Sequence, residues 1–390
     1  MRKVRTGLDT LLERGIDDLI GKELGLISNH TGVTEDFRKG YELLHQAGAK
    51  IRYLFGPEHG FFGAQGEAVP VSDNTEENTN IPIISLYGDD LRPPEDYVKE
   101  LDILLYDIQD LGIRCYTYIY TMINSMKVAA KTKTKFSILD RPPPLSGEVF
   151  EGKPIEEEQN SFIGNYGLPM IYGLSPGELG KYVAEEFGID MDPWVYEMRG
   201  WKRKLWFDEI NLPWVTPSPA IPDFETSLVY PATVLFEATN VSEGRGTTKP
   251  FKYFGAPWLD CRLKQEISRV SSEFGLGGHK LRECRFTPYS SKYEKEECRG
   301  YEIYVNDRIK FQPFKFGLLL VKIIHELYNK EFAWWNSSLK RGKPYFDNLA
   351  GSKQFRIIIE KGGPEEELLD LAEQGVEGFI ERASNYFIYD

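Results

Sequence analysis

Two titratable side chains, Glu58 and His59, stand side by side in the glycine-rich stretch GPEHGFFGAQGE at residues 56–67. The apolar run IRYLF at 51–55 comes directly before it and is typical of a buried strand. A glutamate that only caps a helix does not need Gly and Pro on both sides, whereas a side chain projected from a turn often does. The pattern therefore favours a role for Glu58 and His59 in proton transfer or binding.

Polar clusters also follow other short apolar runs in the first 140 residues. These runs are LGLISN (24–29), IPIISLY (81–87), DILLYDI (102–108) and KFSILD (135–140). The clusters that end them are Ser28-Asn29-His30-Thr31-Gly32, Tyr87-Gly88-Asp89-Asp90, Asp107 to Gly112 with Gln109, and Asp140-Arg141-Pro142. Because parallel strands end at one edge of a sheet, we expect these side chains to share one ligand-binding rim.

The elements that must position this rim alternate regularly. Segments with helical periodicity lie between the apolar runs, at 36–48, about 93–100 and 117–131. Strand and helix alternate at roughly 30 residues per unit, which predicts an α/β fold with helices on both faces of a parallel sheet.

Each cluster also has an ordinary structural interpretation. Ser28, Asn29, Asp89 and Asp90 are common turn formers and helix N-caps, and a lone histidine such as His30 is more often structural. An aspartate within an apolar strand needs a partner or a function. For Asp107, Arg114 is the candidate partner, and the alternative is that Asp107 and Arg114 belong to the site.

The chain changes character after the proline-rich segment LPWVTPSPAIPDF at 212–224. We predict a first domain over 1–223 and a smaller α+β domain over 224–390. In the first domain, the capping pattern of residues 175–188 predicts a helix with Ser175 as N-cap and Glu178 at N3. The segment WKRKLWF at 201–207 predicts a strand. In the second, we expect a strand-like run TVLFEA, an antiparallel pair within 284–305, and helices at 314–330, 364–373 and 375–384.

Two further groups have residue types suited to sugar or anion binding. Tyr116 lies beside the predicted rim and offers a flat ring and a hydroxyl, unless it packs the start of a helix. The run TNVSEGRGTT at 239–248 contains Asn240, Glu243 and Arg245. The guanidinium of Arg245 is suited to a carboxylate or phosphate, and the alternative is a flexible hairpin loop.

Composition excludes several classes of function. The 390 residues carry a formal net charge of −13 without a basic stripe, which argues against a nucleic-acid partner. No apolar run reaches 18 residues, so we expect no membrane span. The sequence lacks a GxxxxGK[ST] or GxGxxG loop, an HExxH motif and a GxSxG elbow, so we predict no cofactor and no metal. Carboxylates, tyrosines and an arginine remain, and glycoside hydrolysis is one of several reactions that they suit.

The cysteines and the N-terminus leave two questions open. Four cysteines are scattered, and the favoured interpretation is free thiols, although Cys284 and Cys298 lie where a cross-strand disulfide is conceivable. The N-terminus has no apolar signal region and predicts an amphipathic helix. We expect a cytoplasmic protein, or a secreted one whose signal peptide has been removed.

Six motifs resemble one family over nearly the whole chain and in the expected order. They are SNHTGV (28–33), LFGPEHGFFG (54–63), DIQDLGIRCYTY (107–118), LDRPPP (139–144), SPAIPDFET (218–226) and TNVSEGRGTTKPF (239–251). The family that they resemble is the exo-β-N-acetylmuramidases typified by NamZ, formerly a domain of unknown function.

The resemblance implies a Rossmann-like first domain, with an active site in the cleft that the second domain closes. It also implies release of N-acetylmuramic acid from the non-reducing end of peptidoglycan fragments. Glu58 corresponds to the suspected catalytic carboxylate, the general acid. Glu243 and Asp107 are candidates for a second acidic group. Arg245 is a candidate to hold the lactyl carboxylate, and the substrate-binding candidates are Asn29, His30, His59, Gln109, Arg114, Tyr116, Asp140, Arg141, Asn240 and Arg245.

Three positions depart from the family's usual motifs. Phe62 replaces an arginine, Pro143 an asparagine, and Tyr172 a common histidine. If the family's polar groups touch substrate there, a different terminal sugar or leaving group follows. A second hypothesis is a muropeptide-binding protein without catalysis. A third, less in keeping with the missing phosphate loop, is a Rossmann enzyme that uses a nucleotide.

Overall fold

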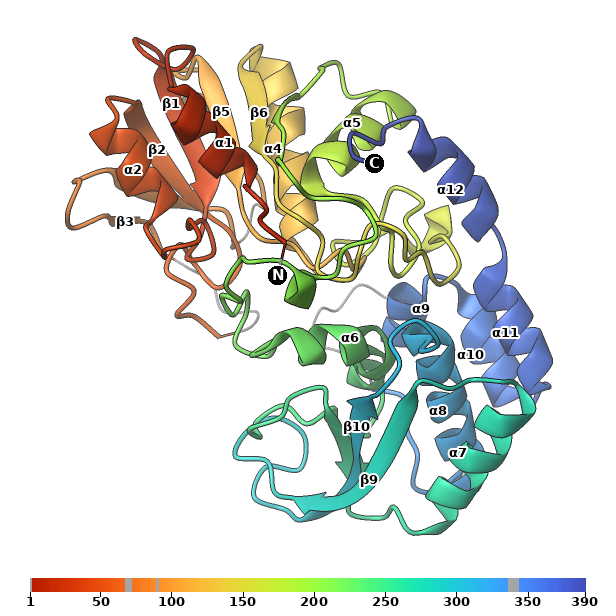
Figure 1. Ribbon diagram of the computed structural model, residues 1–390. Coiled ribbons are helices and arrows are strands. Elements are labelled where there is room, and N and C mark those ends of the chain that lie inside the picture. The colour runs from red at the N-terminus through yellow and green to blue at the C-terminus, as the bar shows by residue number, and fades with distance from the viewer. Residues whose placement is uncertain (1, 67–71, 89–90, 336–343) are drawn as a thin grey trace.

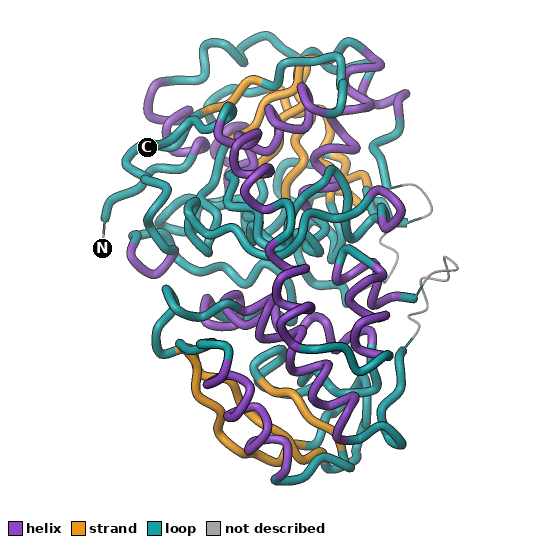
Figure 2. Tube along the Cα trace, turned by 90° about the vertical axis from the view of Figure 1, so that its right-hand side faces the viewer, coloured by secondary structure: helices purple, strands orange, loops and turns teal. Residues whose placement is uncertain are grey.

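The computed structural model of the chain describes residues 2–66, 72–88, 91–335 and 344–390. Figure 1 shows two parts, each built around its own β-sheet. Figure 2 shows the two sheets at opposite ends of the molecule, with helices between them.

The first part is built on a seven-stranded sheet. Its strands are β1 (Glu23–Ser28), β2 (Lys50–Gly56), β3 (Asn74–Thr75), β4 (Pro82–Ser85), β5 (Ile103–Asp107), β6 (Lys135–Leu139) and β7 (Trp194–Tyr196). The order is β3-β4-β2-β1-β5-β6-β7, and every neighbouring pair is parallel except β3 with β4. The five predicted strands are confirmed. The chain leaves β1 toward β2 and later returns to β5 on the other side, so the strand order reverses between β1 and β5.

Helices cover both faces of this sheet. On one face, α1 (Gly7–Arg14) and α2 (Gly40–Gln46) pack through Leu8 and Leu44 against Leu26 of β1. On the other, α3 (Glu95–Val98) and α4 (Tyr118–Thr132) join the large core that contains Ile27. Adjacent residues of β1 thus serve opposite cores, as the two-residue period of a strand requires.

The predicted start of α5 (Pro176–Glu186) is also confirmed. Ser175 Oγ accepts a hydrogen bond from the Glu178 amide at 3.2 Å, and Glu178 Oε2 accepts one from the Ser175 amide at 3.0 Å. This capping box satisfies two amides that the first turn of a helix leaves unpaired.

Two strand predictions are wrong. Residues 201–206 form no strand and lead into a 3₁₀ helix, η2 (Phe207–Glu209), and the seventh strand lies earlier at β7. The run TVLFEA continues α6 (Phe224–Thr233) as the 3₁₀ helix η3 (Val234–Ala238). Most of this run is buried, so its apolar pattern cannot distinguish a strand from a helix. Another short 3₁₀ helix, η1, covers Glu157–Gln159.

The second part holds a three-stranded antiparallel sheet in the order β8-β10-β9. Its strands are β8 (Tyr253–Ala256), β9 (His279–Phe286) and β10 (Cys298–Val305), so the predicted antiparallel pair is confirmed. The helices are α6, α7 (Arg262–Glu273), α8 (Pro313–Leu327), α9 (Tyr345–Ala350), α10 (Lys353–Glu360) and α11 (Glu365–Glu373). All four cysteines of the chain are free.

The last helix, α12 (Val376–Ser384), carries the chain back to the first part, beside α5 (Figure 1). Phe379 packs against Tyr182 with ring centroids 5.5 Å apart. Tyr389 then donates a hydrogen bond of 2.6 Å to the buried Asp140 Oδ2. The C-terminal segment therefore connects the second part of the molecule to the first. The domain boundary between residues 223 and 224 stays a prediction.

Candidate active site

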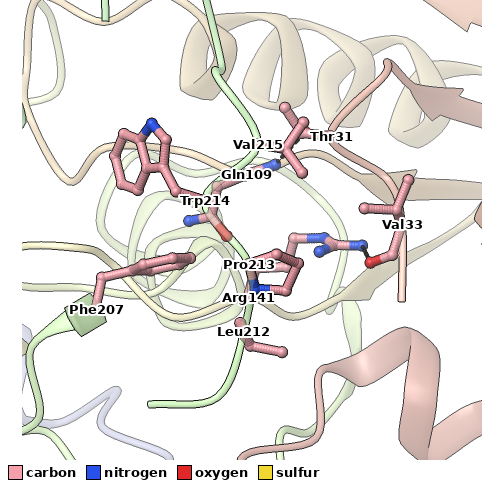
Figure 3. Close-up of a pocket in the computed structure, with 9 residues that line it drawn as sticks. All are labelled: Thr31, Val33, Gln109, Arg141, Phe207, Leu212, Pro213, Trp214 and Val215. Carbon is pink, nitrogen blue, oxygen red and sulfur yellow. Dashed lines mark hydrogen bonds between the residues drawn. The ribbon is translucent and has the colours of Figure 1, made fainter. Parts of the chain in front are cut away.

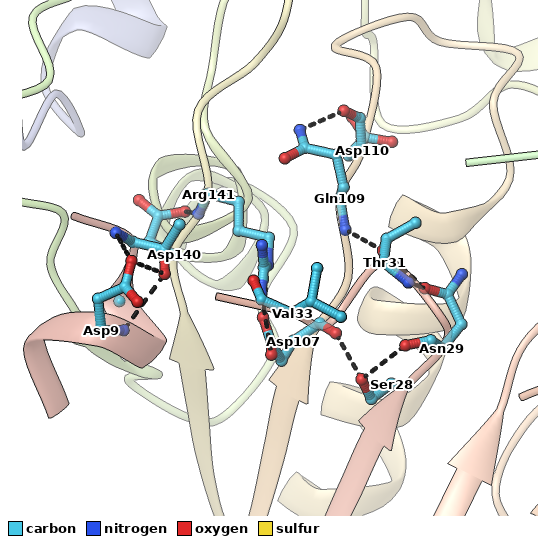
Figure 4. A network of polar contacts seen from close by, with 12 residues as sticks. Asp9, Ser28, Asn29, Thr31, Val33, Asp107, Gln109, Asp110, Asp140 and Arg141 are labelled. Atoms are coloured by element: carbon cyan, nitrogen blue, oxygen red, sulfur yellow. Dashed lines mark hydrogen bonds and ion pairs between the residues drawn. The ribbon is translucent and has the colours of Figure 1, made fainter. Parts of the chain in front are cut away.

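Asp107, at the carboxyl end of β5, is buried in an ion pair with Arg141. Arg141 Nε donates to Asp107 Oδ1 at 2.5 Å and its Nη2 donates to Oδ2 at 3.2 Å (Figure 4). Both side chains are almost fully buried. Arg141 follows β6, so the pair joins two neighbouring strand ends. Asp107 thus has a structural partner, and the structure gives it no exposed face toward a substrate.

Arg114 is not the partner of Asp107, so that expectation is wrong. Its Nη1 donates to the carbonyls of Lys153 and Leu168, and its Nη2 donates to the carbonyl of Leu349 in α9 at 2.7 Å. The fully buried guanidinium therefore ties the loop after β5 to the second part.

The proline-rich segment covers the point where the strand order reverses. Pro213, Trp214 and Val215 line a cavity with Gln109 and Arg141 that holds only about 20 Å³ (Figure 3). That volume is enough for about one water molecule. His30 Nε2 lies 2.7 Å from the Thr216 carbonyl, which can only accept, so this nitrogen carries the proton. The usual ligand crevice of such a sheet is therefore closed by this segment.

The remaining rim residues make internal contacts. Gln109 Nε2 donates to the carbonyls of Asp110 and Pro142, and Asn29 Oδ1 accepts from Thr31. Asp140 Oδ1 accepts from the Arg141 and Gly177 amides, and burial raises the pKa of Asp140 to about 7. Most predicted residues of the rim thus hold the loops of the sheet in place.

Glu58 lies on a tight turn that directly follows β2. The Gly60 amide donates to the Pro57 carbonyl at 2.9 Å, and His59 between them has a φ of +68°. A positive φ at the third position is the requirement of a type II turn, and it is uncommon for a residue other than glycine. His59 Nδ1 donates to the Gln65 carbonyl at 3.0 Å, which fixes the turn in this conformation. Such strain is typical of functional sites.

Two hydroxyl groups hold the carboxyl group of Glu58. Thr117 Oγ1, just before α4, donates to Glu58 Oε2 at 2.7 Å. The hydroxyl of Tyr87, which follows β4, also hydrogen-bonds to Glu58. Asp89 and Asp90 of the same cluster lie outside the described residues. These hydrogen bonds hold the side chain of Glu58 in place. Because Glu58 is only partly buried, its side chain is still accessible to a ligand.

Arg245 and Glu237 form an ion pair on the second part of the molecule. Arg245 Nη2 and Nε both donate to Glu237 Oε1, at 2.6 and 3.2 Å, and Tyr345 donates to Glu237 Oε2 at 3.0 Å. The guanidinium also lies 4.7 Å from the ring centre of Phe251. Arg245 and Glu237 are 19% and 18% exposed, so both remain partly accessible.

Glu243 sits behind this pair and is only 2% exposed. Lys292 Nζ donates to Glu243 Oε2 at 2.8 Å, and Arg245 Nε lies 3.5 Å from Glu243 Oε1. Asn240 exchanges hydrogen bonds with the backbone of Glu331 and Ala333. Both residues therefore support the loop that presents Arg245.

Burial raises the pKa of Glu237 to about 8, and the charges of Glu243 and, to a lesser extent, Glu58 act in the same direction. Burial lowers the pKa of Arg245, and the charge of Glu58 opposes this fall. Glu237 was not among the residues predicted for the site. The signal was an acidic residue within the apolar run TVLFEA, which needs a partner or a function.

Aromatic rings line the same region. Tyr116 lies edge to face with Tyr118 and with Tyr230, and Tyr230 packs on Phe251 at 4.5 Å. Tyr116 is buried, so its ring packs the start of α4 and its hydroxyl lies inside the protein. These rings connect the Glu58 side of the site to the Arg245 side.

The three departures from the usual motifs occupy different environments. Phe62 is 49% exposed and packs edge to face on Phe61. The Tyr172 hydroxyl is buried and donates to Asp110 Oδ2, and Pro143 is buried near Gly112. Phe62 is therefore the departure that changes the exposed surface beside Glu58.

The described residues contain no group of three or more His, Cys, Asp or Glu side chains that could hold a metal ion. Within the same residues, no helix is long and apolar enough to cross a membrane.

Comparisons with known proteins agree along the full length of the chain. Residues 24–225 match the family model "Exo-beta-N-acetylmuramidase NamZ, N-terminal" and residues 228–389 match the corresponding C-terminal model. The peptidoglycan β-N-acetylmuramidase NamZ of Bacillus subtilis strain 168 is 42% identical over 388 residues, which cover 99% of this chain and 92% of that protein.

Two crystal structures of DUF1343 family proteins from Bacteroides fragilis NCTC 9343 share the fold. One has a TM-score of 0.90 at 30% identity and covers 100% of both chains. The other has a TM-score of 0.76 at 27% identity and covers 100% of this chain and 99% of its own. With both family models and a 42% identical relative matching in order, the chain belongs to the exo-β-N-acetylmuramidase NamZ family.

Proposed function

We propose that the protein is an exo-acting glycoside hydrolase that releases terminal N-acetylmuramic acid from the non-reducing end of peptidoglycan fragments. The observation that carries the proposal is the position of Glu58. Two hydroxyl groups fix its carboxyl group on a strained turn, and an ion pair of the second part lies within reach of its charge. The 42% identity to a peptidoglycan β-N-acetylmuramidase over nearly the whole chain supports the same conclusion.

In this proposal Glu58 is the general acid. Hydrolysis of a glycosidic bond needs a carboxylic acid that gives its proton to the leaving oxygen as the bond to the anomeric carbon breaks. Thr117 and Tyr87 orient the carboxyl group, and the strained turn holds it at the end of β2. Asp107 and Glu243 are buried in ion pairs, so they are less suited than Glu58 to contact the reacting bond.

The test compares the wild type with Glu58→Gln on a chromogenic β-N-acetylmuramide. We expect kcat to fall by about 100-fold or more, the usual contribution of general acid catalysis. Glu35→Gln, which also removes a negative charge but from a side chain that is 41% exposed, serves as the control and should keep full activity. Thermal melting shows that both variants are folded. Substantial activity in Glu58→Gln would contradict the assignment, and binding without turnover by the wild type would identify a sugar-binding protein instead.

A further inference from the structure

A large groove lies between the two parts of the molecule, and none of the residues that line it belongs to the candidate active site. Its volume is about 1240 Å³, whereas small-molecule sites usually enclose roughly 300–1000 Å³, so a ligand has room there. The first part contributes residues of the loop at 146–152, with Lys204 and Trp206, and the second part contributes residues of 308–315 and the end of α11. The start of α12, at the right-hand edge of Figure 1, completes the lining.

Glu151 is a buried carboxyl group in the lining of this groove. Its side chain belongs to a residue that is 8% exposed, and its Oε1 accepts a hydrogen bond of 3.0 Å from the Lys315 amide in the first turn of α8. Its Oε2 has no hydrogen-bond partner in the described part of the chain. A buried polar atom without a partner costs free energy, so folded proteins contain few of them. A ligand that brings a donor into the groove would supply the missing contact.

The charges that line the groove favour a cation. Arg308 is already neutralised, because it pairs with Asp208 and Glu209 of the first part. Lys315 pairs with Glu373. Among the described residues, the lining carboxyl groups without an ion pair outnumber the one remaining lining cation, Lys204; they are Glu148, Glu151, Asp370 and Glu377. The groove therefore attracts a positively charged ligand.

Apolar side chains lie in the same lining. Phe150, Trp206 and Phe311 contribute rings, and Ile309 is 77% exposed. A bare metal ion would gain nothing from these surfaces, whereas a cation on a hydrocarbon stem can pack the stem against them and keep its charged end at a carboxylate. The groove thus suits an organic cation.

The single free oxygen of Glu151 favours an ammonium group over a guanidinium. A guanidinium binds a carboxylate best through two parallel hydrogen bonds, one to each oxygen. Oε1 of Glu151 is already occupied by the Lys315 amide, so only Oε2 is available. An ammonium group is a compact charge that needs one oxygen at a time.

We propose that this groove binds a ligand with an alkylammonium group, whose N–H donates to Glu151 Oε2 while its hydrocarbon stem packs against the apolar lining. The group belongs either to a free amine or to a lysine-like side chain of a peptide. The ligand contacts both parts of the molecule, because both contribute to the lining. This inference goes beyond the proposed function, since the groove shares no residue with the turn of Glu58 or the loop of Arg245.

The experiment measures the binding of cadaverine, Nα-acetyl-lysine methylamide and the corresponding norleucine derivative by titration calorimetry at pH 8. Burial raises the pKa of Glu151 to about 7, so most of this group is ionised at pH 8. We expect the wild type to bind the ammonium probes at least about 10-fold more tightly than the norleucine derivative, the effect of one hydrogen bond to a charged group. Tighter binding of cadaverine identifies a free amine as the ligand, and tighter binding of the lysine derivative identifies a peptide.

Glu151→Gln tests the contact itself. It keeps an acceptor for the Lys315 amide but places an NH₂ group where Oε2 lies, so it should bind the lysine and norleucine derivatives equally weakly. Glu297→Gln, on a side chain that is 57% exposed and outside the groove, is the matched control and should bind as the wild type does. Thermal melting shows that both variants are folded.

Three results would overturn the inference. They are no binding of either ammonium probe by the wild type, equal wild-type affinity for the lysine and norleucine derivatives, and wild-type affinity for the ammonium probes in Glu151→Gln. The first two use the unaltered protein, so they decide the question even if Glu151→Gln does not fold.

Discussion

Thr117 donates a hydrogen bond of 2.7 Å to Glu58 Oε2, so the residue before α4 holds the carboxyl group that follows β2. The two residues are 59 positions apart in the sequence. Their contact links the loop after β5 to the turn after β2 and fixes the candidate acid relative to the sheet.

Thr117→Val removes this hydrogen bond and keeps the branched shape of the side chain. We expect kcat to fall about 10-fold, the effect of one hydrogen bond, with KM nearly unchanged. Thr117→Ser restores the hydroxyl and should recover most of the activity. Steady-state kinetics on a chromogenic muramide measures both values, and an unchanged kcat in Thr117→Val would show that this contact does not position Glu58.

Asp107→Asn breaks the buried ion pair with Arg141. We expect the free energy of unfolding to fall by about 3–5 kcal/mol, because the Arg141 charge stays buried without its partner. The double variant Asp107→Asn/Arg141→Met should recover part of this loss. Urea denaturation measures the free energy of unfolding. Normal stability with lost turnover would instead return Asp107 to the catalytic residues.

Glu151 makes stability depend on pH. Its Oε1 accepts a hydrogen bond from the Lys315 amide, and burial raises its pKa from 4.5 to about 7. Between these values the folded state keeps a proton that the unfolded chain has lost, so stability decreases as the pH rises, by about 3 kcal/mol across the window.

Glu151→Gln removes this titration. Its free energy of unfolding should therefore change less between pH 5 and pH 8 than that of the wild type, as measured in urea at both pH values. Glu148→Gln changes an exposed neighbour and should leave the wild-type dependence in place. Equal pH dependence in Glu151→Gln and the wild type would show that Glu151 does not carry the effect.

Tyr389→Phe tests the attachment of the C-terminal segment. The variant leaves the buried Asp140 without one of its donors, and we expect a loss of about 1–3 kcal/mol in the free energy of unfolding. Tyr386→Phe removes a comparable bond of 2.9 Å to Glu186 at the surface and should have little effect. Thermal melting compares the two, and equal melting temperatures would argue against an anchoring role for Tyr389.

Local sequence patterns were sufficient for β1, β2, β4, β5 and β6, but they did not indicate β3 or β7. Runs such as DILLYDI at 102–108 are apolar and bounded by turn residues, and each became a strand of the mostly parallel sheet. The runs at 201–207 and 233–238 failed because short apolar segments suit a strand or a buried helix equally well, and only tertiary packing decides between them.

The candidate site was predictable where the local sequence carries the signal. The glycines around Glu58 indicate a special turn, and the structure has one. The partner of Asp107 in the structure is Arg141, which lies 34 positions further along the chain. No local pattern indicates a contact at that distance, so the sequence analysis named the nearer Arg114 instead. Glu237 was missed because its importance arises from Arg245 and Tyr345, the second of which is 108 positions away.

The most direct test of the proposed function is the product analysis of two defined disaccharides that differ only in the order of their sugars. The protein is incubated with N-acetylmuramyl-β-1,4-N-acetylglucosamine and, separately, with the reversed disaccharide, and the free sugars are measured by mass spectrometry. We predict release of N-acetylmuramic acid from the first substrate, none from the reversed disaccharide, and none from either with Glu58→Gln. Cleavage of the reversed disaccharide, or no cleavage of the first, would contradict the account.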